Sequence, residues 1–121
     1  MISFDELAEF QKDFKYLLKR YRSLREDMEV LKKVLEIIPD ERPPFSFHID
    51  KLGLQTPIIK VKKIVCRTMK GSGANSGLRL IYAYFKEEQK ITFIEIYHKN
   101  DKENEDRQRI IKNFKIRLPG F

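Results

Sequence analysis

Side chains that can hold a phosphate group are concentrated in the second half of this chain. Between Lys51 and Lys86 there are eight basic side chains and no acidic one, whereas the formal net charge of all 121 residues is +7. The rest of the chain therefore sums to −1, and the basicity is local. A concentrated cationic segment on an otherwise nearly neutral domain indicates a polyanionic partner, most simply a nucleic acid.

Two positions are candidates for chemistry rather than simple charge attraction. Arg79 lies between Leu78 and Leu80 in a strand-like run, so we expect it to face a solvated site or an anion, because a buried unpaired charge is costly. An ion pair with Glu95 on the next strand is the alternative. His98 ends the last predicted strand and can exchange a proton near neutral pH. For His98 the alternative is an ordinary surface position.

The types of these side chains suit cleavage of RNA without a metal. The 2′-hydroxyl of RNA can attack the adjacent phosphate, so the protein has to supply proton transfer and cations that stabilise the developing charge. Arginine serves the second role well because its planar fork matches two phosphate oxygens. His48, Cys66 and His98 are widely separated, so we expect no metal site and no cofactor. The glycine-rich loop 70–77 lacks the Walker pattern and is interpreted as a flexible connection.

The elements that must position these residues follow from the apolar spacing. Ser3 with Glu6, and Ser23 with Glu26, have the capping-box form that starts a helix. Apolar residues at helical spacing follow both, and Pro39 ends the second run. The link is short, so the sequence predicts an antiparallel helical hairpin.

The second half predicts strands over 58–69, 78–85 and 91–98, with the last two joined as a hairpin. A final helix is predicted from Lys102 to Phe114, and residues 39–57 form a loop. The expected fold class is thus α+β, with the helical hairpin packed on an antiparallel sheet of about four strands and a C-terminal helix. A chain of this length fits a single domain spanning 1–121.

Composition also predicts the environment of the protein. The chain has no apolar run near the length of a membrane span, and its first residues do not resemble a signal peptide. The single cysteine, Cys66, is expected to be a small buried hydrophobe, which fits a reducing compartment. We therefore expect a cytoplasmic protein with no membrane partner.

The hairpin residues resemble a known family. Gly77-Leu78-Arg79-Leu80-Ile81-Tyr82, a short turn and Ile91-Thr92-Phe93-Ile94-Glu95-Ile96-Tyr97-His98-Lys99 are similar to the RelE/ParE toxin superfamily of toxin–antitoxin systems. The preceding helical hairpin and Lys60-Val61-Lys62 fit the same pattern. The resemblance runs from about Phe4 to Phe114.

The resemblance implies a function and a set of site residues. A member of the RelE/HigB-like branch would be a metal-independent mRNA interferase, an endoribonuclease that inhibits translation on the ribosome and is neutralised by a cognate antitoxin. The family's strand arginine corresponds to Arg79, and its terminal histidine to His98. Arg67 joins these two as a catalytic residue. The implied RNA-binding and phosphate-binding residues are Lys60, Lys62, Lys70, Tyr97 and Lys99.

The sequence departs from the family at two positions and leaves other functions open. Asn100 and Asp106 stand where RelE has an arginine and a tyrosine. One alternative is a ParE-like inhibitor of DNA gyrase that is not an enzyme. Another is an RNA-binding module without catalysis.

Overall fold

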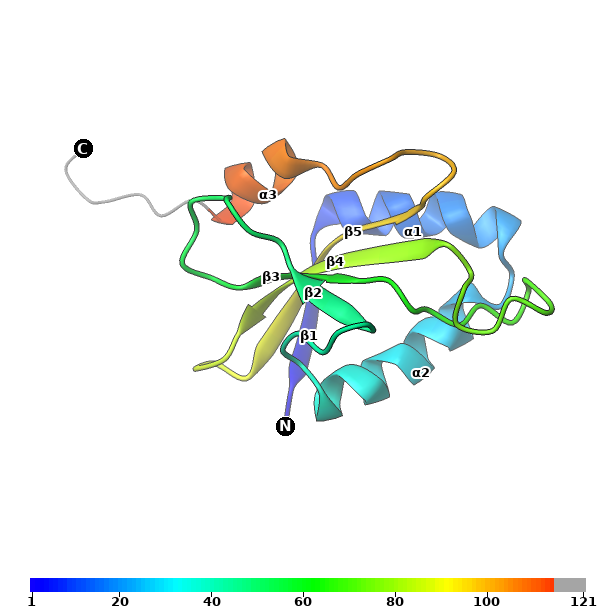
Figure 1. Cartoon of the computed structure of the whole chain (residues 1–121), viewed down its shortest axis with the longest axis horizontal. Coiled ribbons are helices and arrows are strands. Elements are labelled where there is room, and N and C mark those ends of the chain that lie inside the picture. Colours follow the sequence, from blue (N-terminus) through cyan, green and yellow to red (C-terminus); the bar gives the residue numbers. More distant parts are fainter. Residues whose placement is uncertain (115–121) are drawn as a thin grey trace.

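The computed structural model describes residues 1–114 and has an α+β fold, in which three helices surround one five-stranded mixed sheet (Figure 1). In chain order the elements are β1 (Ser3–Glu6), α1 (Ala8–Arg20), α2 (Leu24–Ile37), β2 (Ser46–His48), β3 (Ile58–Val61), β4 (Leu78–Phe85), β5 (Lys90–His98) and α3 (Arg107–Phe114). The order across the sheet is β1-β5-β4-β3-β2. Within this part of the chain, none of the helices has the length and apolar character needed to cross a membrane.

The first strand corrects the expected sheet. Ser3–Glu6 does not start a helix but forms β1, which pairs in parallel with β5 from Ser3 opposite Lys90 to Glu6 opposite Phe93. The sheet is therefore mixed and has five strands, since β2 is added at the other edge. α1 begins at Ala8 without a side-chain cap. Pairing with β5 and the Phe4–Phe93 ring contact, with centroids 5.7 Å apart, outweigh the capping-box signal.

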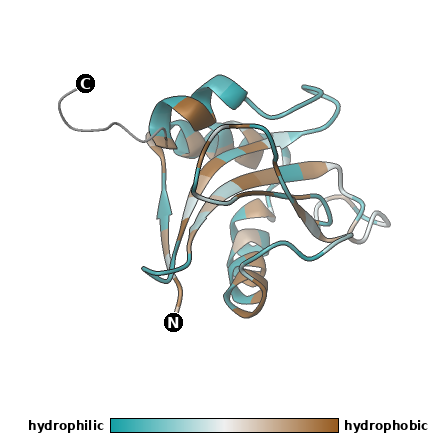
Figure 2. Ribbon diagram, turned by 60° about the vertical axis from the view of Figure 1, so that its left-hand side comes forward, coloured by the Kyte–Doolittle hydropathy of each residue, from teal (hydrophilic) through white to brown (hydrophobic). Residues whose placement is uncertain are grey.

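The helical hairpin is confirmed and covers one face of the sheet (Figure 1). Leu17 of α1 and Leu24 and Leu35 of α2 are buried against Leu80 and Phe93 of the sheet. Figure 2 shows how brown hydrophobic segments run along the strands and alternate with teal ones on the helices. This alternation is the amphipathic pattern that makes a helix pack on a sheet face.

α3 packs against the opposite face. Ile110 of α3 is fully buried in a second apolar cluster with Ile58, Ile81 and Ile94. The helix is shorter than expected, because it begins at Arg107 and not at Lys102. Lys102 instead forms an ion pair with Glu95 of β5, and the Asp106 backbone N–H donates to Glu95 at 2.8 Å, which holds the intervening residues against the sheet.

A β-bulge sets the register of the β4–β5 hairpin. Phe85 pairs with Lys90 and Tyr82 with Phe93, but Ile81 pairs with Glu95, so Ile94 is the extra residue on β5. Side chains stabilise this irregularity at the free edge of β5. The Asp13 carboxylate accepts a hydrogen bond from the Ile96 N–H at 3.3 Å, and Arg109 donates to the Ile94 carbonyl at 2.9 Å. The same two side chains form an ion pair at 2.7 Å.

The strand predicted over 58–69 is only partly correct. β3 ends at Val61, and one further ladder bond follows, in which the Lys62 N–H donates to the Phe45 carbonyl at 2.9 Å. Arg67 therefore lies in a loop and not on the sheet. Its guanidinium forms ion pairs with Asp27 and Glu26 of α2. The hydrogen bond and charge of Asp27 raise the pKa of Arg67.

The start of α2 is held to this loop by side chains rather than by a capping box. Ser23 is the N-cap but makes no capping hydrogen bond, and its hydroxyl donates to the Asp27 carboxylate at 2.6 Å. The Thr68 N–H and hydroxyl both donate to Ser23 Oγ. Asp27 is 6 % exposed and also accepts from the Arg67 N–H and Nε.

Replacing Asp27 by alanine is expected to lower the free energy of unfolding by about 2–3 kcal/mol, because three donors lose a buried ionised acceptor. Glu26→Ala is the matched control, since the side chains of its ion pair with Arg67 are 72 % and 60 % exposed. It is expected to cost less than about 1 kcal/mol. Urea denaturation measures both, and equal costs would contradict the role assigned to Asp27.

Candidate phosphate-binding site

A cationic pocket lies at the end of the sheet where β4 begins and β5 ends. Its volume is about 300 Å3, and its lining residues contain four basic side chains and no acid. The lining comes from β2 and the residues before it, both ends of the loop between β3 and β4, the start of β4 and the residue after β5. The lining residues are Pro44, Phe47, Lys62, Lys63, Asn75, Gly77, Arg79 and Lys99.

Of the four basic residues that line the pocket, Arg79 alone belongs to a strand. Its side chain is partly exposed, and Nη1 donates to the carbonyls of Lys62 at 3.2 Å and Leu78 at 3.3 Å. The expected alternative, an ion pair with Glu95, is not formed. The register places Arg79 opposite Tyr97, and Glu95 is paired with Lys102. Arg79 is therefore oriented by neutral carbonyls, which leaves its charge available to an anion.

The three lysines are exposed and differ in how they are held. The Lys62 ammonium lies 5.0 Å from the centroid of the Phe47 ring, which is a cation–π arrangement. The Lys63 ammonium donates to the Asn75 side-chain oxygen at 3.0 Å. Lys99 follows β5, and its backbone N–H donates to the Gly77 carbonyl at 2.9 Å. None of these partners is an acid, so the pocket keeps its positive charge.

Gly77 lines the pocket and packs closely against His98, which lies behind it and does not line the pocket itself. Gly77 has φ of +87°, and a Cβ at this position would lie 2.7 Å from His98 Nε2. His98 is 8 % exposed and stacks against Tyr21, the residue that follows α1, with ring centroids 6.1 Å apart. Its Nε2 donates to the Ser76 carbonyl at 2.9 Å, and its Nδ1 accepts from the Asn100 N–H at 3.1 Å. His98 thereby fixes the backbone on both sides of the pocket.

The structure brings together only some of the residues predicted for the site. Lys62, Arg79 and Lys99 line the pocket. His98 does not share it with Arg79, because the two residues project from opposite faces of the sheet. Arg67 is tied to α2 by Asp27 and Glu26, and Lys70 is exposed in the loop without lining the pocket.

Lys60 and Tyr97 lie on the face that carries Arg79, but they are covered. Lys60 pairs with Glu105 at 2.9 Å, and both side chains are largely buried. Burial alone would lower the pKa of Lys60 and raise that of Glu105. Burial is the largest single cause, but the hydrogen bond and charge of the partner, with Tyr97 beside Lys60 and a backbone hydrogen bond and Arg107 beside Glu105, together outweigh it. The pKa of Lys60 is therefore raised and that of Glu105 is lowered. Burial raises the pKa of Tyr97, although the Lys60 charge opposes this in part.

Sequence reasoning missed Lys63 and Phe47 as part of the site. Lys63 directly follows Lys62 and was counted in the basic segment, but a continuous strand would have placed the two on opposite faces. Both residues instead follow the end of β3, where the chain is no longer a regular strand, and both line the pocket. Phe47 sits on β2, a strand that the two neighbouring prolines obscured. Its pairing with Lys60 of β3 depends on long-range contacts.

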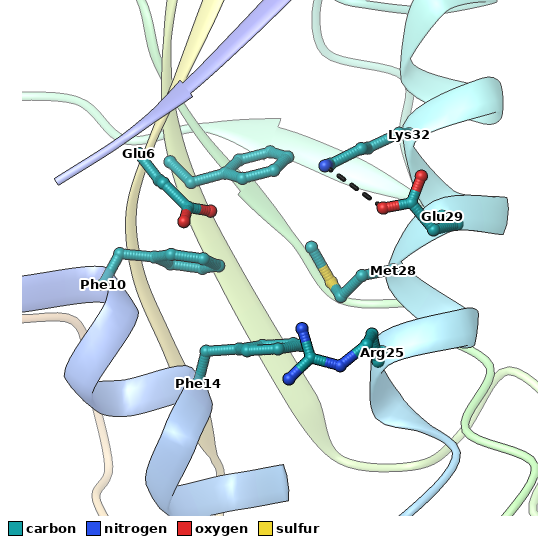
Figure 3. Close-up of a pocket in the computed structure, with 8 residues that line it drawn as sticks. Glu6, Phe10, Phe14, Arg25, Met28, Glu29 and Lys32 are labelled. Carbon is teal, nitrogen blue, oxygen red and sulfur yellow. Dashed lines mark hydrogen bonds and ion pairs between the residues drawn. The ribbon is translucent and has the colours of Figure 1, made fainter. Parts of the chain in front are cut away.

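A second hollow lies between α1 and α2 on the other layer of the fold (Figure 3). Its volume is about 190 Å3, and Phe10, Phe14 and Met28 form its apolar part. Figure 3 shows an ion pair between Lys32 and Glu29 at the rim, at 3.4 Å. Glu6 and Arg25 complete a rim with equal numbers of acids and bases. This charge balance makes the second hollow less suited to a polyanion than the pocket around Arg79.

Within residues 1–114 no three His, Cys, Asp or Glu side chains are grouped closely enough to hold a metal ion. In the pocket around Arg79, four basic side chains surround a space that can hold a phosphate group. Comparison with known proteins found no matching family model and no matching curated protein.

Proposed function

We propose that this protein is a RelE-like toxin, a ribosome-dependent mRNA endoribonuclease, and that the pocket around Arg79 holds the RNA backbone at the cleavage point. The observation that supports this best is the set of four cations without an acid, of which Arg79 is oriented only by carbonyl groups. Phosphate contacts by lysine and arginine supply most of the affinity of proteins for nucleic acids. Phe47 adds an aromatic surface on which a base can stack.

The proposed reaction is an internal transfer of the phosphoryl group. The 2′-oxygen bonds to phosphorus, the bond from phosphorus to the 5′-oxygen breaks, and the products are a 2′,3′-cyclic phosphate and a 5′-hydroxyl. The 2′-hydroxyl gives up one proton, and the leaving 5′-oxygen takes one. Arg79 stabilises the extra negative charge of the transition state with its fork of donors. A pocket lysine in its ammonium form can give the proton to the leaving 5′-oxygen, and a water molecule takes the proton from the 2′-hydroxyl.

His98 has a positioning role in this proposal, since both of its ring nitrogens are already engaged. It holds the Ser76 carbonyl and the Asn100 N–H, and so sets where Gly77 and Lys99 lie. The proposed partners are mRNA on the ribosome and a cognate antitoxin that neutralises the toxin. The proposed location is the cytoplasm, where translating ribosomes are found.

A cell-free translation reaction tests the proposal. Adding the protein should stop synthesis and produce new message ends, with 5′-hydroxyl groups on the downstream fragments. Purified message without ribosomes should stay intact. Inhibited translation with uncut message would contradict the endoribonuclease proposal.

A second candidate, an RNA-binding module without catalysis, is favoured by one observation. Neither His48 nor His98 lines the pocket, because His48 pairs with Asp40 and His98 is buried, which leaves proton transfer to lysine and water. The same translation reaction separates the two. A binding module would leave every message end unchanged. Any inhibition of translation by it would be proportional to the fraction of RNA that it occupies.

A further inference from the structure

Beside the pocket, on the same face of the sheet, the basic side chain of Lys60 forms an ion pair with the carboxylate of Glu105. Lys60 of β3 pairs with Ile81, which is two residues from Arg79 on β4. Its ammonium lies 2.9 Å from a carboxylate oxygen of Glu105, and the two side chains are 14 % and 11 % exposed. Lys60 is one of the basic residues that the sequence predicts to bind RNA. It lies on the same face as Arg79, but its charge is neutralised by the ion pair with Glu105.

An unsatisfied hydroxyl adjoins this ion pair. Tyr97 lies directly opposite Arg79 in the β4–β5 register and is 5 % exposed. The ammonium groups of Lys60 and Lys102 are 5.9 Å and 5.2 Å from the centroid of its ring. Its Oη is buried and, among residues 1–114, has no partner with regular hydrogen-bond geometry, although the Lys60 ammonium lies close enough to act on it. An acceptor placed between Lys60 and Tyr97 would satisfy the donor capacity of this hydroxyl.

Glu105 belongs to a short acidic segment, residues 100–106, that links β5 to α3 (Figure 1) and reaches this face through the ion pair with Lys60. Glu95 anchors the segment through Lys102 and the Asp106 N–H. Glu105 itself contributes one side chain to Lys60, so it can leave without breaking the anchor at Glu95.

We propose that Lys60 and Tyr97 form a second phosphate subsite beside the Arg79 pocket, and that Glu105 occupies it until RNA binds. This inference rests on the proposed function, because it takes the ligand to be an RNA strand. A phosphodiester has two unbridged oxygens, so one can accept from Lys60 while the other accepts from the Tyr97 hydroxyl. Exchanging a carboxylate for a phosphate leaves the charge of Lys60 compensated, and the freed Glu105 gains water. Glu105 thus lowers the affinity for RNA without touching the pocket itself.

Glu105→Gln and Glu103→Gln provide a matched test, because both remove one negative charge from the same segment. Glu103 is exposed, whereas Glu105 holds Lys60. The probe is a 2′-O-methyl RNA strand of about ten nucleotides, a length that single-stranded binding sites commonly span and a chemistry that cannot be cleaved. Glu105→Gln should raise the affinity about three- to tenfold and steepen the slope of log K against log salt by about 0.7. Glu103→Gln should change the affinity less than about twofold with the same slope as the parent.

The double variant Lys60→Ala with Glu105→Gln should lose the gain, and thermal unfolding should show that each variant is folded. Equal effects of the two glutamine variants, or a gain that persists without Lys60, would overturn the inference. If the parent protein binds the strand through Arg79 but Glu105→Gln behaves like Glu103→Gln, only the inference fails. If neither the parent nor Glu105→Gln binds the strand, the RNA-directed function fails with it.

Discussion

Replacing Arg79 by alanine is expected to reduce ribosome-dependent message cleavage by about 100- to 1,000-fold, the range found when one preorganised donor to a transition-state charge is removed. The expectation follows from the position of Arg79. It lines the acid-free pocket and is oriented by the carbonyls of Lys62 and Leu78 alone. Quantitative mapping of message ends at matched toxin concentrations measures the effect.

Two comparisons show whether this loss is catalytic. Arg79→Lys keeps the charge but not the fork, so it should retain binding and recover only part of the cleavage. RNA affinity of Arg79→Ala should fall about tenfold or less, well short of the loss in cleavage. If cleavage and affinity fall by the same factor, Arg79 is a phosphate contact only, and the binding-module candidate is favoured.

Gly77→Ala is expected to cause the largest loss of stability from a single methyl group. Its φ of +87° disfavours any residue with a side chain, and the added Cβ would lie 2.7 Å from His98 Nε2. His98 cannot move away freely, because it is buried and holds the Ser76 carbonyl and the Asn100 N–H. Backbone strain and overpacking together should cost about 2–4 kcal/mol, which corresponds to a fall in Tm of roughly 10 °C.

Gly73→Ala isolates the part of this cost that comes from the backbone alone. Gly73 also has a positive φ, +55°, but no atom lies within 4 Å of an added Cβ. It should lose only about 1 kcal/mol. Calorimetric unfolding of both variants measures the difference between the two losses of stability. A Gly77→Ala protein as stable as Gly73→Ala would show that His98 does not pack against Gly77.

The sequence predicted the helical hairpin and the β4–β5 hairpin because both depend on local apolar spacing. β1 was missed because Ser3 and Glu6 fit a local helix-start pattern, whereas the parallel pairing with β5 depends on residues nearly 90 positions away. The end of β3 was missed because Ile64 and Cys66 are apolar like strand residues, although they are buried in a loop under α2.

The candidate site was predicted only in part, and the bulge in β5 explains why. If the pairing of Phe85 with Lys90 continued without interruption, Arg79 would lie opposite Ile96 and would share a face with His98. The extra residue, Ile94, shifts the register, so that Arg79 lies opposite Tyr97. A shift of one residue moves every following side chain to the other face. Asp13 and Arg109, which hold the bulge, come from distant parts of the chain.

The sequence predicted a group of basic residues, but it did not show which of them remain free of an acidic partner. Charge counting treats Lys60, Lys62 and Arg67 alike. In the structure acids pair with Lys60 and Arg67, while Lys62 lies over Phe47. The acids that neutralise them, Glu105 and Asp27, lie outside the basic segment 51–86 and approach it only through the fold. Local composition therefore indicated a polyanion partner but not the place where it binds.

The most direct test of the central claim, that the pocket around Arg79 binds RNA phosphates, is the salt dependence of affinity for an uncleavable RNA strand. Removing one pocket cation, by Lys62→Ala or Lys99→Ala, should reduce the slope of log K against log salt by about 0.7. Lys33→Ala on α2, an exposed lysine outside the pocket, should leave the slope unchanged. Equal slopes for the pocket variants and the Lys33 variant would contradict the claim.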